Sequence, residues 1–213
     1  RDRVALRVAT PGGTGDHDSV SARTEPFGLY LHIPFCSVRC DYCSFATWTD
    51  RHHLIDEYLA ACRADADRLV AGGLPLVTSV FVGGGTPTLV PADGLVSVLD
   101  RVPRADDCEV TVECNPDDVT AELLETYASG GVNRLSFGVQ STSAHVLQAL
   151  GRSHDRDNVA RCVELARSTG FTTFNLDVIY GGAGESLEDW CRTLDDVVAF
   201  DPPHVSAYAL TPE

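Results

Sequence analysis

Short apolar segments alternate with amphipathic segments along most of this chain. Between the apolar segments, apolar residues recur at spacings of three and four, which predicts five helices. The helical stripes are Leu54, Tyr58, Leu59, Cys62 and Leu69; Leu95, Val98 and Leu99; Leu123, Leu124 and Tyr127; Val159, Cys162, Val163 and Ala166; and Leu187, Trp190, Cys191, Leu194 and Val197. The six apolar segments are rich in β-branched and aromatic residues, as buried strands are. They are Phe27–Ile33, Val77–Val82, Cys108–Glu113, Arg134–Val139, Thr172–Ile179 and His204–Tyr208.

This alternation predicts an α/β fold with a parallel sheet and right-handed crossovers. Six strand–helix units indicate an open, partial (β/α)6 barrel related to the TIM barrel rather than the closed eight-unit barrel. A doubly wound sheet is the alternative, and periodicity alone does not exclude it. Ser186, followed by Asp189, predicts a capping box that opens the last helix.

The domain organisation predicted from composition is simple. Residues 1–26 are rich in Gly, Asp and Ser, which predicts a mobile leader, and residues 27–213 form one domain with no linker. The sequence contains no Met, so we expect it to be a piece of a longer protein. No apolar run approaches the ~20 residues of a membrane-spanning helix, and the start does not resemble a signal peptide.

The net charge of −15, from 16 basic and 31 acidic residues, argues against a nucleic-acid partner. An acidic, well-solvated surface explains this charge.

Three cysteines form a compact motif, Cys36-x3-Cys40-x2-Cys43, directly after the first strand. Three thiolates in one short loop leave one over if two pair as a disulfide, but they can ligate an iron–sulfur cubane whose fourth iron stays open. A zinc module is the competing interpretation, although zinc sites take four ligands and no fourth is evident. The five other cysteines are interpreted as small buried residues, which together with the cluster indicates a reducing cytoplasm.

Further polar and glycine-rich groups follow the other strands. Gly83-Gly84-Gly85-Thr86 follows the second, and Glu113, Gln140 and Asp177 lie at the ends of the third, fourth and fifth. Because parallel α/β folds build their sites at this edge of the sheet, we expect these groups to meet around the cysteine loop. The glycines would let a ligand approach the backbone closely, and the turn lacks the pattern of a phosphate loop. Arg152 could hold a carboxylate through two parallel hydrogen bonds.

The cysteine motif, preceded by Tyr30-Leu-His-Ile-Pro-Phe35, resembles the radical S-adenosylmethionine superfamily. The strings Val82–Thr88, Glu113–Pro116, Arg134–Gln140 and Asn175–Gly181 are similar to the branch that contains oxygen-independent coproporphyrinogen III oxidase and the heme chaperone HemW.

This resemblance implies a radical S-adenosylmethionine barrel in which Cys36, Cys40 and Cys43 hold a [4Fe-4S] cluster. It also implies that the amine and carboxylate of S-adenosylmethionine chelate the open iron, and that a reductant supplies the cluster with an electron. The residues implied to contact S-adenosylmethionine are Tyr30, Gly84, Gly85, Thr86, Glu113, Gln140, Arg152, Asp177 and Ala209.

Phe45 separates the two branches. The coproporphyrinogen oxidases carry a fourth cysteine at this position, whereas the HemW type does not, so the resemblance favours a heme chaperone that passes heme to acceptor hemoproteins. A porphyrinogen oxidase is the alternative.

Family members continue into a C-terminal region with a His-Asn-x-x-Tyr-Trp string, which this sequence does not contain. Where the family has a proline after Tyr-Gly-x, this chain has the looser Gly181-Gly182-Ala183-Gly184.

The histidines are interpreted without a heme-ligand role. We expect His32 to orient the cysteine loop. His52, His53, His145 and His154 are predicted to be ordinary surface residues.

Overall fold

The computed structural model describes residues 6–9 and 25–210 of the chain. Their centre is one seven-stranded sheet whose strands are ordered from β1 to β7 exactly as they follow in sequence. β1 pairs with β2 antiparallel, and every later pair is parallel. The strands are β1 (Leu6–Ala9), β2 (Gly28–Ile33), β3 (Val77–Gly84), β4 (Arg104–Cys114), β5 (Arg134–Gln140), β6 (Phe174–Tyr180) and β7 (His204–Ala209).

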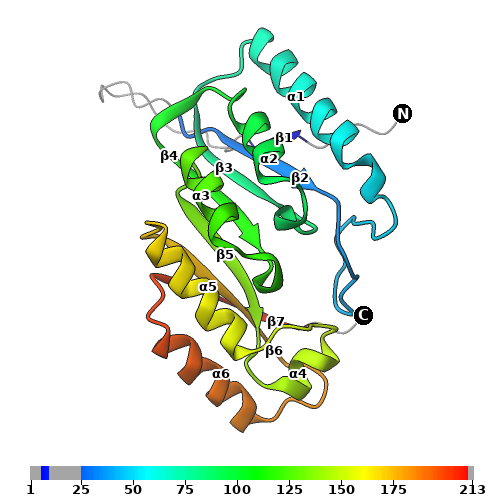
Figure 1. Ribbon diagram of the computed structural model, residues 1–213, viewed down its shortest axis with the longest axis vertical. Helices are drawn as coiled ribbons and strands as arrows, with labels where there is room; N and C mark the ends of the chain where they lie inside the picture. Colours follow the sequence, from blue (N-terminus) through cyan, green and yellow to red (C-terminus); the bar gives the residue numbers. More distant parts are fainter. Residues whose placement is uncertain (1–5, 10–24, 211–213) are drawn as a thin grey trace, which may run out of the picture.

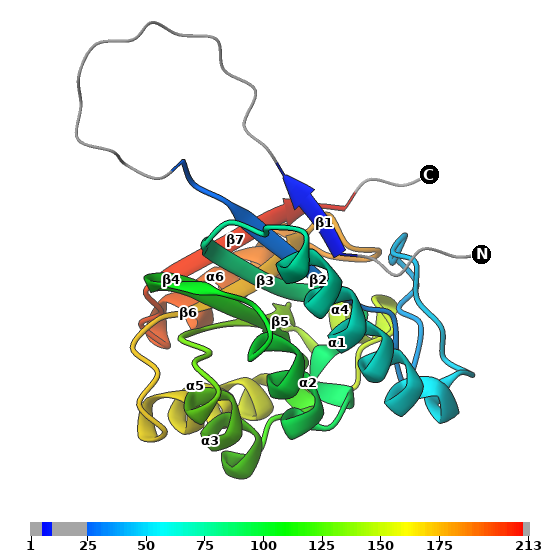
Figure 2. The same ribbon diagram turned by 90° about the horizontal axis from the view of Figure 1, so that it is seen from above.

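Helices connect the parallel strands, and Figure 2 shows α1, α2, α3 and α5 together on one side of the sheet. Their apolar stripes pack on the strands in a single hydrophobic cluster. The helices are α1 (Ile55–Ala71), α2 (Ala92–Leu99), α3 (Ala121–Ser129), α4 (Ala144–Ala149), α5 (Arg156–Ser168) and α6 (Leu187–Ala199). The short α4 is not predicted by the sequence pattern, because its six residues are too few to show a helical period.

The two faces of the sheet differ in chemistry. Along β6, Phe174, Leu176 and Val178 are buried in the hydrophobic cluster, whereas Asn175 and Asp177 line a large cavity on the other face. Successive side chains of a strand point to opposite faces, so this alternation gives the sheet one apolar and one polar face. The runs of apolar residues in the sequence indicate strands that are apolar on both faces. The folded sheet instead has one apolar and one polar face.

The prediction of an open, partial barrel is confirmed. Six parallel strands in consecutive order form an open sheet, as Figure 1 also shows. The doubly wound alternative is wrong, because such a sheet reverses its strand order at a switch point and this one does not. Each predicted strand is found within a few residues of its expected limits.

β1 lies within the segment that the sequence predicts to be a mobile leader. Its four residues pair with β2 from Leu6 opposite Leu31 to Ala9 opposite Gly28. This pairing covers the backbone groups that the edge of β2 would otherwise expose. The rest of the predicted leader, residues 1–5 and 10–24, lies outside the described residues.

In α6 the predicted apolar stripe is partly wrong. Leu187 is 78% exposed and Cys191 is exposed, so Cys191 is not the buried residue that was expected. Asp189 and Thr193 are buried instead. The reason is a polar contact with the segment after β5: Asp189 accepts hydrogen bonds from Ser186 and Ser143, and Thr193 accepts one from the backbone of Thr142. The capping box of Ser186 and Asp189 is confirmed.

The four other scattered cysteines, Cys62, Cys108, Cys114 and Cys162, are buried as expected. Among the described residues, no helix has the length and apolar character needed to cross a membrane.

Candidate functional site at the cysteine loop

A cavity of about 1040 Å³ lies on the polar face of the sheet and reaches the cysteine loop. It brings together eleven of the twelve residues predicted to form the site, from seven separate segments of the chain. They are Cys36, Cys40, Cys43, Gly84, Gly85, Thr86, Glu113, Gln140, Arg152, Asp177 and Ala209. The convergence expected from the strand ends is therefore present in the folded chain.

Tyr30 is the exception, since it is not among the described residues that line this cavity. Its ring stacks on Phe81, with ring centroids 6.2 Å apart, and its hydroxyl lies 3.1 Å from His32 Nδ1. Burial, with a smaller effect of the Glu113 charge, raises the pKa of the Tyr30 hydroxyl to about 12. In this structure Tyr30 lies beside Phe81, its partner on the neighbouring strand, and packs against a residue of the cavity wall.

The two ends of the cysteine loop are joined to each other by backbone hydrogen bonds. The amide of Cys36 donates to the carbonyl of Trp48 at 3.1 Å, and the amide of Trp48 donates to Pro34 at 2.8 Å. These bonds form an isolated parallel bridge between Phe35 and Trp48. They close the segment that carries all three cysteines into a loop above the end of β2.

Two histidines also hold this loop. His52 Nε2 donates to the carbonyl of Cys36 at 2.8 Å, and His32 Nε2 lies 3.0 Å from the carbonyl of Ala46. His32 therefore has the orienting position that the sequence indicates. His52 is exposed, as predicted, and its ring is in addition bonded to the loop. The same prediction is wrong for His154, which is 3% exposed and bonds the carbonyl of Val139.

The three thiols are free, with Cys36 buried and the other two half-buried. Hydrogen-bond donors point at two of the sulfurs: Thr86 Oγ1 donates to Cys36 Sγ at 3.6 Å, and Arg152 Nη1 donates to Cys40 Sγ at 3.7 Å. Burial raises the pKa of the Cys36 thiol, and the hydrogen bond from Thr86 partly opposes this effect. Such donors are suited to thiolates that carry negative charge as ligands.

The glycine turn after β3 is shaped by the protein's own contacts. A side chain at Gly83 would come within 2.5 Å of Glu113 Oε2, and one at Gly84, where φ is +110°, within 2.2 Å of His32 Nδ1. The amide of Gly85 donates to the carbonyl of Ile33 at 2.7 Å. The turn therefore needs glycine so that it can pack beneath the cysteine loop, in addition to the ligand access expected from sequence.

Glu113 is the most perturbed acid that faces the cavity. Its Oε2 accepts a hydrogen bond from the amide of Gly84 at 3.0 Å. Burial raises the pKa of its carboxyl to about 7; the nearby Asp177 charge adds to the increase and the Gly84 hydrogen bond reduces it. A cationic group of a ligand would stabilise the ionised form that burial disfavours.

Asp177 belongs to a polar network that spans three strands. Its two oxygens accept hydrogen bonds from Ser136 at 2.7 Å and Asn175 at 2.8 Å. Ser206 on β7 donates in turn to Asn175 at 3.1 Å. Within residues 25–210, neither Glu113 nor Asp177 caps a helix or joins a surface ion pair, which are the ordinary roles of isolated acids at strand ends.

Gln140 has a left-handed backbone, with φ of 63°, at the end of β5. The register between β5 and β6 shifts between Gly138 and Gln140, so an irregularity in the strand accompanies this conformation. Non-glycine residues in this region cost about 1–3 kcal/mol and concentrate at functional sites. The irregularity helps to bring Gln140 to the wall of the cavity.

Arg152 is held by the protein on one side of its guanidinium. Nη2 donates to Asn115 Oδ1 at 2.6 Å and to the carbonyl of Gly138 at 3.2 Å. The bidentate hydrogen bonding of Arg152 to a ligand carboxylate stays a prediction. Asn115 was missed as a site residue, although it lies in the Glu113–Pro116 string and lines the cavity.

The described residues contain no preformed site in which three or more His, Cys, Asp or Glu side chains surround a single metal ion. The donor set that does face the cavity consists of three thiols on one loop, which is the set that a cubane with an open iron uses.

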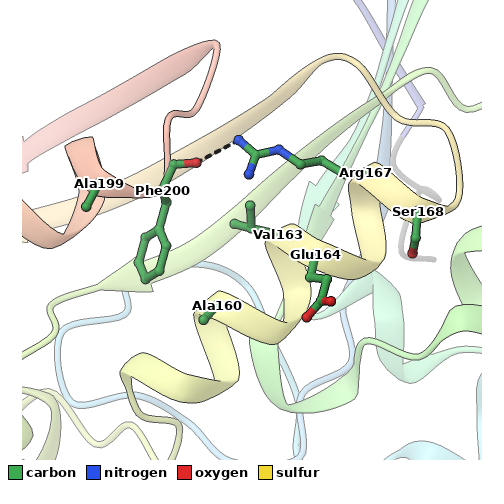
Figure 3. Close-up of a pocket in the computed structure, with 7 residues that line it drawn as sticks. All are labelled: Ala160, Val163, Glu164, Arg167, Ser168, Ala199 and Phe200. Carbon is green, nitrogen blue, oxygen red and sulfur yellow. Dashed lines mark hydrogen bonds between the residues drawn. The ribbon is translucent and has the colours of Figure 1, made fainter.

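A second cavity, of about 460 Å³, lies between α5 and α6 and contains none of the predicted site residues. Figure 3 shows Arg167 reaching from α5 toward Phe200, whose carbonyl accepts its hydrogen bond at 2.8 Å. Arg167 also donates to Asp201 at 2.9 Å, so its guanidinium satisfies carbonyls at the end of α6. This cavity is a seam between two helices, and its arginine has a structural role.

Comparisons with known proteins agree with this geometry. The family model described as the Radical SAM superfamily matches residues 30–197. The heme chaperone HemW of Mycobacterium tuberculosis is 42% identical over 198 residues, which cover 89% of this chain and 50% of that protein. HemW of Escherichia coli is 39% identical over 197 residues, covering 90% of this chain and 52% of that protein. The chain thus spans about half the length of the curated relatives it matches.

Among solved structures, coproporphyrinogen III oxidase (HemN) from Escherichia coli, described as a radical SAM enzyme, has a TM-score of 0.78 and 30% sequence identity. The match covers 85% of this chain and 43% of that one. The matched family segment contains the cysteine loop and most of the residues that line the cavity. The chain belongs to the radical SAM superfamily.

Proposed function

We propose that Cys36, Cys40 and Cys43 hold a [4Fe-4S] cluster and that S-adenosylmethionine binds in the adjoining cavity. We further propose that the chain handles heme as HemW proteins do and passes it to acceptor hemoproteins in the cytoplasm. One observation carries the first part: three free cysteines line the same cavity as the glycine turn and the polar strand ends. The similarity to HemW proteins supports the second part.

The chain's own residues have distinct tasks in this proposal. Thr86 and Arg152 donate to ligand sulfurs, while Glu113 offers a buried acceptor for the N–H groups of the S-adenosylmethionine amine. Asp177, held by Ser136 and Asn175, is placed to accept from ribose hydroxyls. When bound, the reduced cluster supplies the electron for cleavage of the sulfonium. The protein contributes positioning and exclusion of water.

A second candidate function is porphyrinogen oxidation, which the similarity to the HemN structure favours. Phe45 argues against it, because this position is a cysteine in coproporphyrinogen oxidases by the family resemblance. The side chain of Phe45 is 60% exposed and faces the same cavity.

Anaerobic reconstitution tests the cluster. We expect about four irons per chain and a broad visible absorbance that dithionite bleaches. Cys40→Ala should lose nearly all of the iron, whereas Cys191→Ala, which removes an exposed cysteine of α6, should keep it. A colourless protein with one bound zinc, or equal iron in both variants, would contradict the cluster assignment.

A paired assay separates the two functions. The reconstituted chain is incubated with S-adenosylmethionine, a reductant and either heme or coproporphyrinogen III. Heme binding without turnover of the porphyrinogen supports the chaperone, and transfer is then measured to an apo-hemoprotein acceptor. Formation of protoporphyrinogen would replace the chaperone assignment with the oxidase.

A further inference from the structure

The large cavity extends well beyond the residues predicted to bind the cluster and S-adenosylmethionine. Those residues lie around the carboxyl ends of the strands, but the lining continues to Arg134 and His204, the first residues of β5 and β7. At about 3.3 Å per residue, Arg134 lies roughly 20 Å from Gln140 along β5. The volume of about 1040 Å³ is also large for a small-molecule site. The cavity thus has room for a second ligand.

Arg134 and His204 form a hydrogen-bonded pair at this far end. Arg134 Nη2 lies 2.6 Å from His204 Nδ1. Arginine has no acceptor, so it must donate to Nδ1, which leaves any ring proton of neutral His204 on Nε2. The other N–H groups of Arg134 and the Nε2–H of His204 can each donate to an acceptor of a ligand. The other contacts of Arg134 are longer: Thr111 Oγ1 at 3.4 Å and the exposed Glu109 at 3.9 Å.

Aromatic side chains also line the walls of this cavity. Phe81, on β3, is 37% exposed and Tyr208, on β7, is 55% exposed, and both face the cavity. Phe81 and Arg134 lie at one level of the sheet, because each is paired in register with Thr111. The strand-end acids Glu113 and Asp177 lie nearer the cysteine end. This arrangement fits a broad apolar ligand whose anionic end points toward Arg134.

We infer that Arg134 and His204 form a carboxylate-binding subsite for a tetrapyrrole with acidic side chains, at the opposite end of the cavity from the cluster. The inference rests on the proposed function, which supplies the class of ligand. Phe81 and Tyr208 contact the macrocycle, and the guanidinium holds a carboxylate by charge-assisted hydrogen bonds.

The test compares coproporphyrin III with its tetramethyl ester, using fluorescence anisotropy of the porphyrin titrated with the chain. Arg134→Gln should weaken binding of the free acid about tenfold, the loss typical of one charged hydrogen-bonding group, and leave the ester unchanged. His204→Gln should act in the same direction. Glu109→Gln should strengthen binding of the acid, because it removes a competing carboxylate. Arg101→Gln, which removes a charge paired with Asp67 outside the cavity, is the control.

Circular dichroism and urea unfolding show whether each variant is folded, and Arg134→Lys, which keeps the charge, should restore part of the affinity. Equal weakening of acid and ester by Arg134→Gln would overturn the subsite and indicate a structural role. Binding of both probes without any effect of Arg134→Gln would overturn the subsite alone. Failure of the wild-type chain to bind either probe would overturn the subsite and the tetrapyrrole function, while iron content tests the cluster independently.

Discussion

Gly84 shows how single residues join the sheet to the cysteine loop. Its φ of +110° and the ring of His32, 2.2 Å from where a Cβ would lie, leave no room for a side chain. His32 in turn contacts the carbonyl of Ala46 in the loop. A change at Gly84 is therefore transmitted to the segment that carries the cysteines.

Gly84→Ala should lower the free energy of unfolding by roughly 3 kcal/mol or more, because backbone strain and a steric clash add together. Gly73→Ala is the matched control: Gly73 also has a positive φ, of +88°, but nothing lies within 4 Å of its Cβ position. It should cost only about 1 kcal/mol, for the backbone alone. Urea denaturation measures the free energy of unfolding of both variants. Equal decreases would show that the clash with His32 does not contribute to the loss of stability.

Glu113 links stability to pH. Its carboxyl has a pKa of about 7 in the folded chain against an ordinary value of 4.5, so the folded state binds its proton more tightly than the unfolded state does. The contribution of Glu113 to the free energy of unfolding is therefore fully present below pH 4.5 and is lost as pH rises through 7. Glu113→Gln should remove this loss.

The ligand-free Glu113→Gln variant should exceed wild type by about 1–3 kcal/mol at pH 8, with little difference near pH 4.5. Glu125→Gln, on the exposed side of α3, controls for the removal of one negative charge. Urea denaturation across this pH range is the measurement. A difference that does not change with pH would contradict the assignment. Because Glu113 is proposed to accept from the amine of S-adenosylmethionine, the same variant should bind this ligand more weakly.

At the scale of elements, the cysteine loop is held by several independent anchors rather than by its own sequence. A backbone bridge between Phe35 and Trp48, His32 of β2 and His52 each hold a different part of the loop. A loop that must hold three ligands in a fixed geometry benefits from such support, since ligand positions are set by the groups behind them.

His52→Ala should speed the loss of the cluster in air severalfold, because it removes the hydrogen bond to the Cys36 carbonyl. His53→Ala is a close control, since His53 is exposed and has no side-chain hydrogen bond within residues 25–210. The decay of visible absorbance after exposure to oxygen gives the rate for each variant. Similar rates for the two variants would remove His52 from the support of the loop.

For the whole molecule, the sequence predicts the architecture well because each strand and its helix carry a local pattern. The order of the strands and the face on which the site lies follow from that alternation. Contacts between distant segments could not be predicted in this way. The bonds of His52 to Cys36 and of Asn115 to Arg152 join residues separated by 16 and 37 positions. The spacing of apolar residues within one helix or strand contains no information about such contacts.

Periodicity also failed where polar groups replace apolar ones inside the fold. Asp189 and Thr193 are buried in α6 because serine and threonine residues 141–143 offer them hydrogen bonds. The apolar stripe predicted from the sequence leaves Asp189 and Thr193 out of the buried face and includes Leu187 and Cys191 in it. The family resemblance, by contrast, located most of the cavity lining, because its motifs lie at strand ends that the parallel sheet brings together.

The open form of the sheet leads to a final prediction about its uneven stability. β5 is hydrogen-bonded on both sides, whereas β7 pairs only with β6 in the described part of the chain and its side chains are exposed or half-buried. Amides in residues 204–209 should therefore exchange with deuterium at least tenfold faster than those in residues 134–140, since an edge strand opens without disturbing the core. Mass spectrometry of peptides from these two segments, at constant pH, gives the comparison. Because β7 carries Tyr208 and His204 of the inferred subsite, a bound porphyrin should slow exchange in β7 more than in β5. Equal protection of the two strands without ligand would mean that the sheet opens only as a single unit.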